Sequence, residues 1–198
     1  MSDAVLAILI GYLIGSCPFG YWAGLLKGID LRKEGSGNTG GTNAVRVLGP
    51  RIGIPVIVLD VLKGTAAVLI ASSFGGTGAE VLAAVAAVLG HAFPIFLRFR
   101  GGKAVATGAG AMFGLAPEIA AGVTLLWLVV ALLTRYVSVA SMVAALAFVL
   151  SAILTGQPWP VVAFTVFGTC VVFWRHRTNI ARLRAGTENR VNLRGARS

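Results

Sequence analysis

The sequence has few charged residues, very few acidic residues and only two cysteines. Charged side chains make up 12% of the 198 residues, and Asp and Glu together number seven. This scarcity, with a mean hydropathy of +0.85, excludes a soluble globular domain and indicates an integral membrane protein. The acidic residues are also too few and too scattered to suggest a metal site, so no metal and no other cofactor is expected.

The cysteines and the basic residues argue against two further features, a cysteine-based disulfide or metal site and a nucleic-acid partner. Cys17 and Cys170 both lie inside apolar segments, which predicts buried thiols rather than a disulfide or a metal site. The net charge of +10 would suit a nucleic-acid partner. However, the basic residues stand between apolar segments and do not form one continuous face, so nucleic acid is not an expected partner.

Seven apolar segments follow one another along the chain. They cover residues 4–26, 52–73, 79–97, 104–116, 119–134, a stretch that follows Ser138 and ends near residue 154, and 161–174. A helix rises ~1.5 Å per residue, so a segment of about 20 residues crosses the ~30 Å hydrocarbon core. Segment 104–116 is short for a crossing and would have to tilt or lie in a thinned region.

The basic residues predict the orientation. Sixteen of the 17 Lys and Arg fall in four places: five at 27–51, three at 98–103, Arg135 alone, and seven after Trp174. The turns near 74–78, 116–118 and 155–160 have none. Basic connections stay on the cytoplasmic side, so this alternation predicts seven crossings. The expected fold is an all-α integral membrane protein of seven transmembrane helices, with the N-terminus outside and the C-terminus cytoplasmic. It forms one domain over 1–198, with a basic cytoplasmic tail at 175–198.

The most distinctive stretch is polar: residues 35–43, followed by Arg46. Glycines, hydroxyls and amides fill it: Gly35, Ser36, Gly37, Asn38, Gly40, Thr42 and Asn43. Backbone N–H groups freed by glycine, with hydroxyls and a guanidinium, are the donors that an oxyanion needs. A flexible linker is the alternative, although linkers seldom carry so many amides and hydroxyls in tight order. The glycine spacing is not a dinucleotide fingerprint, because an apolar helix and not a strand precedes it.

A second cluster surrounds Lys103. Gly101 and Gly102 permit a tight turn with exposed N–H groups, and the Lys103 ammonium suits phosphate. Thr107 follows on the next segment, and we include it among the candidate binding residues. Arg98 and Arg100 are equally well explained as membrane anchors. His91 is either a packed histidine or a catalytic one, and the sequence does not decide between them.

A third cluster stands at the start of the basic tail. His176 and Asn179 are three residues apart, so a continuing helix places them on one face. The histidine could bind an anion when protonated or act as a general base when neutral. Ser138 and Ser141 could present hydroxyls to the same region, or be small residues at a helix contact. A solvated basic helix end explains Arg175, Arg177, Arg182 and Arg184.

Two acidic residues have structural interpretations. Asp60 and Lys63 are opposite charges close together inside a span, and such charges should pair or line a polar cavity. A structural pair is the first interpretation, and a role in the site is the second. Glu188, with several arginines nearby, is expected to organise the tail.

Taken in order, these motifs strongly resemble the bacterial acyl-phosphate-dependent glycerol-3-phosphate acyltransferases (the PlsY family). The resemblance rests on Gly-Ser-Gly-Asn-x-Gly-x-Thr-Asn with Arg46, on Gly-His-x-Phe-Pro with Gly-Gly-Lys103 and Val-Ala-Thr107, and on Arg-His-Arg-x-Asn179. It spans nearly the whole chain. Two positions depart from the family pattern: Gly41, where Ala is common, and Ala104, where Gly is common. Ala104 would restrict the backbone if its position needs a positive φ.

The resemblance implies a seven-helix fold and transfer of a fatty acyl group from acyl phosphate to the 1-hydroxyl of sn-glycerol 3-phosphate. The products would be lysophosphatidate and phosphate, in phospholipid biosynthesis. Ser36, Asn38, Thr42, Asn43 and the glycines around them would hold the phosphoryl group of acyl phosphate. Glycerol 3-phosphate would be held by Arg46, Lys103, Ser141, His176 and Asn179. The residues expected in catalysis are Ser36, Arg46, His176 and Asn179.

The expected partners are acyl phosphate, glycerol 3-phosphate and membrane lipid, and a monomer is expected. The expected location is the bacterial cytoplasmic (inner) membrane, crossed several times, with the active site facing the cytoplasm. A small phosphate or organophosphate transporter is the rival class. It predicts polar residues at mid-bilayer depth and an internal repeat, whereas here no such repeat is seen and the polar residues cluster at one face. A non-enzymatic scaffold leaves the polar stretch at 35–43 unexplained.

Overall fold

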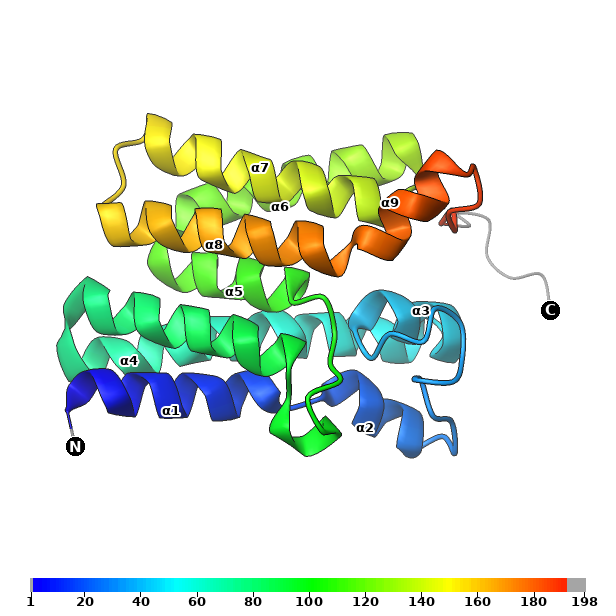
Figure 1. The fold of residues 1–198 in the computed structure, drawn as a ribbon, viewed down its shortest axis with the longest axis horizontal. Helices are drawn as coiled ribbons and strands as arrows, with labels where there is room; N and C mark the ends of the chain where they lie inside the picture. Colours follow the sequence, from blue (N-terminus) through cyan, green and yellow to red (C-terminus); the bar gives the residue numbers. More distant parts are fainter. Residues whose placement is uncertain (1, 192–198) are drawn as a thin grey trace.

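The structure, a computed structural model, describes residues 2–191 and contains only helices and connecting loops within that range (Figure 1). The all-α prediction is therefore confirmed for the described residues. In chain order the elements are α1 (Asp3–Ser16), α2 (Phe19–Leu25), α3 (Gly41–Leu48), α4 (Pro50–Ala92), the 3₁₀ helix η1 (Ile95–Leu97), α5 (Val105–Leu115), α6 (Pro117–Thr134), α7 (Val137–Leu154), α8 (Trp159–Arg175) and α9 (Arg177–Arg184).

Helix α4 is a hairpin of two arms. Its backbone leaves the helical region at Gly75 (φ 158°) and Gly76 (φ 49°), conformations that glycine adopts without steric cost. The chain reverses there, and the two arms run side by side (Figure 1). The bend falls inside the turn predicted at 74–78. The uncharged turn of the sequence is thus a two-glycine reversal within one long apolar region.

Two predicted segments break earlier than hydropathy suggested. The chain leaves α1 after Ser16, and α2 begins only after Pro18, whose ring lacks an N–H and opposes helix continuation. The segment predicted at 79–97 ends as an α-helix at Ala92, and the short η1 follows Pro94. Both segments still fall inside regions long and apolar enough to cross a membrane, Asp3–Leu25 and Pro50–Leu97, but neither is one continuous α-helix. In both places a proline interrupts a run that is apolar on either side.

Small residues let the helices pack at short range. A Cβ added at Gly15 of α1 would lie 2.2 Å from the carbonyl oxygen of Ala87, on the second arm of α4. On the other side of α4, the Thr65 hydroxyl donates a 2.7 Å hydrogen bond to the carbonyl of Gly110 in α5. Close backbone approach and interhelical hydrogen bonds of this kind are typical of membrane helix bundles.

The outer surface is apolar. Four regions, Asp3–Leu25, Pro50–Leu97, Pro117–Thr134 and Val137–Leu154, are long and apolar enough to cross a membrane, and α5 and α8 are shorter apolar helices. Cys17 is half-buried and Cys170 is exposed on α8, so the expectation of two buried thiols was wrong for Cys170. The number of crossings and the orientation of the termini stay predictions.

The path of the chain brings four connections to one end of the bundle. The α2–α3 loop, the segment between η1 and α5, the α6–α7 junction and the α8–α9 junction all lie there (Figure 1). These connections carry the polar motifs of the sequence. Residues distant along the chain can therefore form one site.

Candidate active site

A cavity of about 270 Å³ opens at this end of the bundle. Its polar wall includes Ser36, Asn38, Thr42, Asn43, Arg46, Lys103, Ser138, Ser141, His176, Asn179, Arg182 and Glu188. Its apolar wall includes Met112, Phe113, Val123, Trp127, Ala144, Phe148, Phe164 and Val172. Along α7, Ser138 to Phe148 spans ten residues, which is about 15 Å of helix. The cavity therefore leads from a polar end into an apolar channel between α5, α6, α7 and α8.

Asn43 holds the loop that forms one side of the polar end. Its Oδ1 accepts the backbone N–H of Ser36 at 2.9 Å, and its Nδ2 lies 2.9–3.2 Å from three loop carbonyls, those of Leu31, Glu34 and Asn38. The Asn43 side chain is 2% exposed, so these bonds replace water for a buried amide. The residue thus shapes the 35–43 loop, in addition to lining the cavity.

Arg46 extends from α3 beside this loop. Its Nη1 donates a 3.4 Å hydrogen bond to Oδ1 of Asn43, the one hydrogen-bond partner of this guanidinium within residues 2–191. Gly40 N–H donates to Asn38 Oδ1 at 2.8 Å, which closes the turn before α3. The guanidinium is therefore placed at the cavity with most of its five donors available for an anion.

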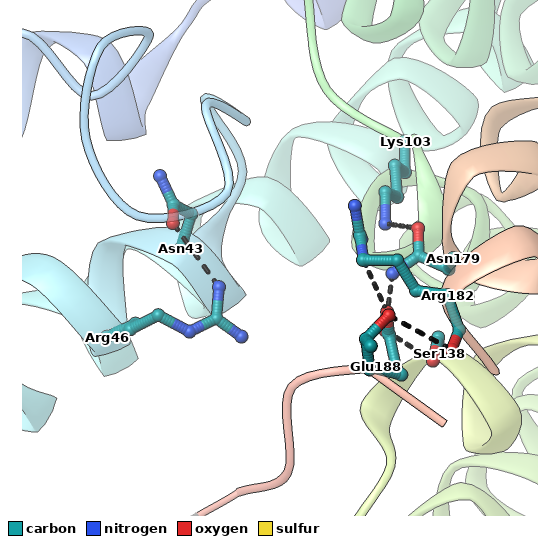
Figure 2. A network of polar contacts seen from close by, with 8 residues as sticks. Asn43, Arg46, Lys103, Ser138, Asn179, Arg182 and Glu188 are labelled. Atoms are coloured by element: carbon teal, nitrogen blue, oxygen red, sulfur yellow. Dashed lines mark hydrogen bonds and ion pairs between the residues drawn. The ribbon is translucent and has the colours of Figure 1, made fainter. Parts of the chain in front are cut away.

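Lys103 and the tail form the opposite side (Figure 2). The Lys103 ammonium donates to Oδ1 of Asn179, and Nδ2 of Asn179 donates to Oε1 of Glu188 at 2.5 Å. The same carboxylate accepts the Ser138 hydroxyl and the Arg182 guanidinium, each at 2.8 Å. Figure 2 shows this cluster facing Arg46 and Asn43, and both groups line the cavity.

The electrostatics of this end favour an anion. The pKa of Lys103 is lowered to about 8, mainly by burial and also by the charges of Arg182, Arg175 and Arg46, while the charge of Glu188 opposes the shift. A bound phosphate would offset the repulsion among these cations. Glu188 stays ionised: burial opposes its charge, but hydrogen bonds from Asn179, Arg182 and Ser138 keep its pKa below the ordinary value.

His176 lies between α8 and α9 and is 2% exposed. Its Nδ1 lies 2.7 Å from the carbonyl oxygen of Val172. A carbonyl can only accept, so the ring proton is on Nδ1 and Nε2 keeps its lone pair. Burial, followed by the charge of Lys103, lowers the pKa of His176 to about 4. A neutral imidazole with a free Nε2 is the form that a general base requires.

Known proteins similar to this chain belong to one family of enzymes. The family model for glycerol-3-phosphate acyltransferase matches residues 5–186. A glycerol-3-phosphate acyltransferase from Rubrobacter xylanophilus is 49% identical over 188 residues, 94% of each chain. Another, from Synechococcus, is 46% identical over 197 residues, 98% of each chain. This chain belongs to the glycerol-3-phosphate acyltransferase family.

Solved structures of the family have the same fold. The glycerol 3-phosphate form of PlsY, an integral membrane glycerol 3-phosphate acyltransferase, matches with a TM-score of 0.93 at 41% identity, over 96% of both chains. Its lysophosphatidic acid form matches with a TM-score of 0.90 at 40% identity, again over 96% of both chains. The resemblance to the PlsY family is confirmed, and with its long apolar helices this acyltransferase homologue is a multi-pass membrane protein.

Most residues predicted for the site of this acyltransferase homologue lie at the cavity. Ten of them line it: Ser36, Asn38, Gly40, Thr42, Asn43, Arg46, Lys103, Ser141, His176 and Asn179. Five others do not line it: Gly35, Gly37, Gly101, Gly102 and Thr107. Gly35 and Gly37 have positive φ and turn the loop that Asn43 holds. Thr107 is fully buried and contacts His91.

Two cavity residues were assigned elsewhere by the sequence. Arg182 was attributed to a solvated helix end. Glu188 was expected to organise the tail, and it does pair with Arg182 (2.8 Å), but this ion pair also lies at the polar wall. Arg182 is three residues after Asn179 on α9, so a shared helix face was the available signal. The position of Glu188 depends on the tail folding back onto Arg135, whose carbonyl accepts the N–H of Val191 at 2.8 Å. Within residues 2–191, His, Cys, Asp and Glu form no group of three suited to a metal.

Proposed function

We propose that this chain transfers a fatty acyl group from acyl phosphate to the 1-hydroxyl of sn-glycerol 3-phosphate. The products are 1-acyl-sn-glycerol 3-phosphate (lysophosphatidate) and inorganic phosphate. One observation carries the proposal: a single cavity joins a cationic, amide-rich end to an apolar channel. That shape suits one reaction partner that is a phosphate and another that combines a phosphate with a long acyl chain.

The polar end offers groups for two phosphate sites. Ser36, Asn38 and Thr42 on the α3 side would hold the phosphoryl group of acyl phosphate, with the turn glycines Gly35, Gly37 and Gly40 shaping the loop. Arg46, Lys103, Ser141, His176 and Asn179 would hold glycerol 3-phosphate. A second phosphate site beside the reacting carbonyl favours an acyl phosphate donor over a thioester, whose sulfur carries no such charge.

The chemistry is a direct displacement. The 1-hydroxyl oxygen attacks the acyl carbonyl carbon and forms the ester bond, and the bond from that carbon to the phosphate oxygen breaks. Phosphate leaves with the bonding electron pair, next to Arg46 and the 35–43 loop. Acyl phosphate is an activated mixed anhydride, so alignment of the two substrates and neutralisation of charge supply most of the acceleration.

The hydroxyl proton has two possible acceptors. Nε2 of neutral His176 is one, and an oxygen of a substrate phosphate is the other. The protonation state of His176 supports the first, because Nδ1 is committed to Val172. Among the cavity residues, Asn179 and Lys103 would orient the acceptor substrate through their mutual hydrogen bond.

We further propose seven crossings of the bacterial cytoplasmic membrane by a monomer with a single domain. Basic connections at the site end support a cytoplasmic active site, with the N-terminus outside. Both proposed substrates would then enter from the cytoplasm or from the inner leaflet. The α4 hairpin supports the count, because its two arms supply two of the seven apolar segments.

The test is an assay on detergent-solubilised, metal-stripped protein. Palmitoyl phosphate and glycerol 3-phosphate are supplied, and release of phosphate and formation of lysophosphatidate are measured. Parallel reactions contain palmitoyl-CoA or an acyl carrier protein thioester as donor. Product from acyl phosphate alone supports the reaction and the donor. Product from a thioester alone contradicts the donor, and no product from any donor with folded protein contradicts the enzyme and calls for uptake assays in liposomes.

A further inference from the structure

Three buried polar side chains lie together at the cavity wall and are not used by the proposed reaction: Asp60 and His91 line the cavity, and Thr107 lies behind them. Nδ1 of His91 lies 3.0 Å from the Thr107 hydroxyl and 3.6 Å from Oδ1 of Asp60. Asp60 is 2% exposed, His91 is 9% exposed and Thr107 is fully buried. Asp60 and His91 come from the two arms of α4, and Thr107 comes from the first turn of α5. Buried polar groups of this kind are costly unless they are well paired, so their placement requires a reason.

The His91 ring packs against the turn that carries Lys103. A Cβ at Gly102 would lie only 2.1 Å from Nε2 of His91, so the ring occupies the space beside that glycine. The backbone adds to the contact: Gly102 N–H donates to the His91 carbonyl at 3.1 Å, and Gly101 N–H donates to the Ala92 carbonyl at 3.2 Å. The imidazole therefore fixes the chain immediately before Lys103.

The same ring also fixes the chain after Lys103. Thr107 lies four residues later, where α5 begins, and its hydroxyl bonds to Nδ1. Lys103 is thus held between two points of contact with one histidine. On the side of the ring away from Lys103, Asp60 contacts Nδ1 of His91. Asp60 also forms a 2.7 Å ion pair with Lys63, and the Lys63 ammonium donates to the Cys17 carbonyl at 2.8 Å. This anchors the ring to both α1 and α4.

We propose that His91 is a positioning residue for Lys103. Its ring, oriented by Asp60 and Thr107, sets where the Lys103 ammonium meets the phosphate of glycerol 3-phosphate. The inference rests on the proposed function, because its readout is the affinity for that substrate. It assigns His91 no contact with substrate and no proton transfer.

The expected effect falls on one substrate. His91→Leu removes both ring nitrogens, and we expect the KM for glycerol 3-phosphate to rise at least tenfold while the KM for acyl phosphate changes less than threefold. His91→Asn places an amide near the position of Nδ1, whereas His91→Gln places it near Nε2. Because Thr107 and Asp60 contact Nδ1, Asn should restore more affinity than Gln. The pH at which the KM for glycerol 3-phosphate begins to rise should also move in His91→Leu, since a displaced Lys103 titrates in a different environment.

A second pair of variants keeps the proposal testable if His91→Leu does not fold. Thr107→Val removes only the hydroxyl that contacts Nδ1, and the KM for glycerol 3-phosphate should rise several-fold. Thr107→Ser keeps a hydroxyl and should lie closer to wild type. The matched control is Thr65→Val, which removes a hydrogen bond between α4 and α5 at Gly110, away from the Lys103 turn. It should leave both KM values unchanged, and thermal unfolding in detergent compares the stability of all variants.

The outcomes separate the two proposals. An inactive wild-type protein, with every donor, contradicts the proposed function itself. An active wild type with unchanged KM for glycerol 3-phosphate in folded His91 and Thr107 variants overturns only the positioning role. If the His91 variants raise both KM values equally, and by the same factor as Thr65→Val, His91 acts through stability alone. That result would also overturn the positioning role.

Discussion

The ammonium of Lys103 donates a hydrogen bond to Oδ1 of Asn179, a residue 76 positions later in the chain. This contact joins the loop before α5 to α9, and the same asparagine continues to Glu188 of the tail. The polar end of the cavity is therefore a connected set of charged and amide groups. Substitution of any of these residues should therefore first change the affinity for the phosphate group of a substrate.

Replacement of Lys103 should weaken binding of glycerol 3-phosphate. A hydrogen bond to a charged group contributes about 1.5–3 kcal/mol, so Lys103→Met should raise the KM about 10- to 100-fold. Steady-state kinetics with saturating acyl phosphate measure this. Lys33→Met is the control, because Lys33 is an exposed loop lysine outside the cavity. An unchanged KM in Lys103→Met would remove this residue from the site.

The same lysine predicts a pH dependence. Burial lowers its pKa to about 8, so the ammonium is present below that pH and is lost as the pH rises through it. The KM of the wild type for glycerol 3-phosphate should therefore rise above about pH 8. In Lys103→Arg the guanidinium stays charged over this range, and the KM should stay level with pH. The same alkaline rise in both proteins would trace the effect to another group.

Arg46→Ala should abolish activity and leave the protein folded. Arg46 has one described hydrogen bond, to Asn43, and that bond is long at 3.4 Å, so its loss costs the fold little. Its removal takes a guanidinium from the phosphate end of the cavity. Activity and thermal unfolding in detergent are measured together. Arg51→Ala is the matched control, since Arg51 is exposed at the start of α4 and should stay active.

His176→Asn tests the proton acceptor. General base catalysis contributes about 10²- to 10⁴-fold, so loss of Nε2 should lower kcat by that factor if His176 accepts the proton. A fall in kcat of less than tenfold, with a raised KM, would instead favour a substrate phosphate as base. The wild-type pKa of about 4 adds a second check, because this histidine becomes charged, and inactive as a base, only as the pH falls toward 4.

The sequence predicted an all-helical membrane protein and the polar segments that meet at one end of the bundle, because composition and charge placement constrain both strongly. It could not predict the break at Pro18 or the helix end at Ala92, since hydropathy stays high through both places. It also could not show that Asn43 shapes its loop, because residue types give possible donors but not their partners. The place of Glu188 depends on how the tail folds back, which no local pattern encodes.

Ala104 adopts the positive φ that would make alanine restrictive at this position. The sequence indicated that alanine would restrict the backbone if the position needed a positive φ, and the structure gives φ 60° and ψ 13°. Such a conformation costs a non-glycine residue roughly 1–2 kcal/mol. Gly41, the other departure, has little room: a Cβ there would lie 2.3 Å from Cγ1 of Ile57. The close packing of α3 on α4 thus explains glycine at that position.

A larger side chain at Gly168 should limit the length of the acyl chain that the enzyme accepts. Gly168 lies on α8, eight residues before His176, which is about 12 Å along the helix toward the apolar end. It lines the cavity, and an added Cβ would meet no atom within 4 Å, so a larger side chain would enter the channel. Gly168→Leu should lower kcat/KM for palmitoyl phosphate at least tenfold and leave octanoyl phosphate within threefold, since the shorter chain ends before the blockage. Competition between the two donors in one reaction measures the ratio directly.

The matched control for this variant is Gly122→Leu. Gly122 lies on α6, an added Cβ there also meets no atom within 4 Å, and the residue is exposed and does not line the cavity. The two variants therefore add the same side chain to a helix in the same bundle and differ in whether it points into the channel. An unchanged donor ratio in Gly168→Leu, or the same shift in Gly122→Leu, would contradict the channel between α5, α6, α7 and α8 as the acyl-chain site. A shift confined to Gly168→Leu would connect chain length to that channel, because a side chain that fills part of an apolar channel costs the longer ligand most.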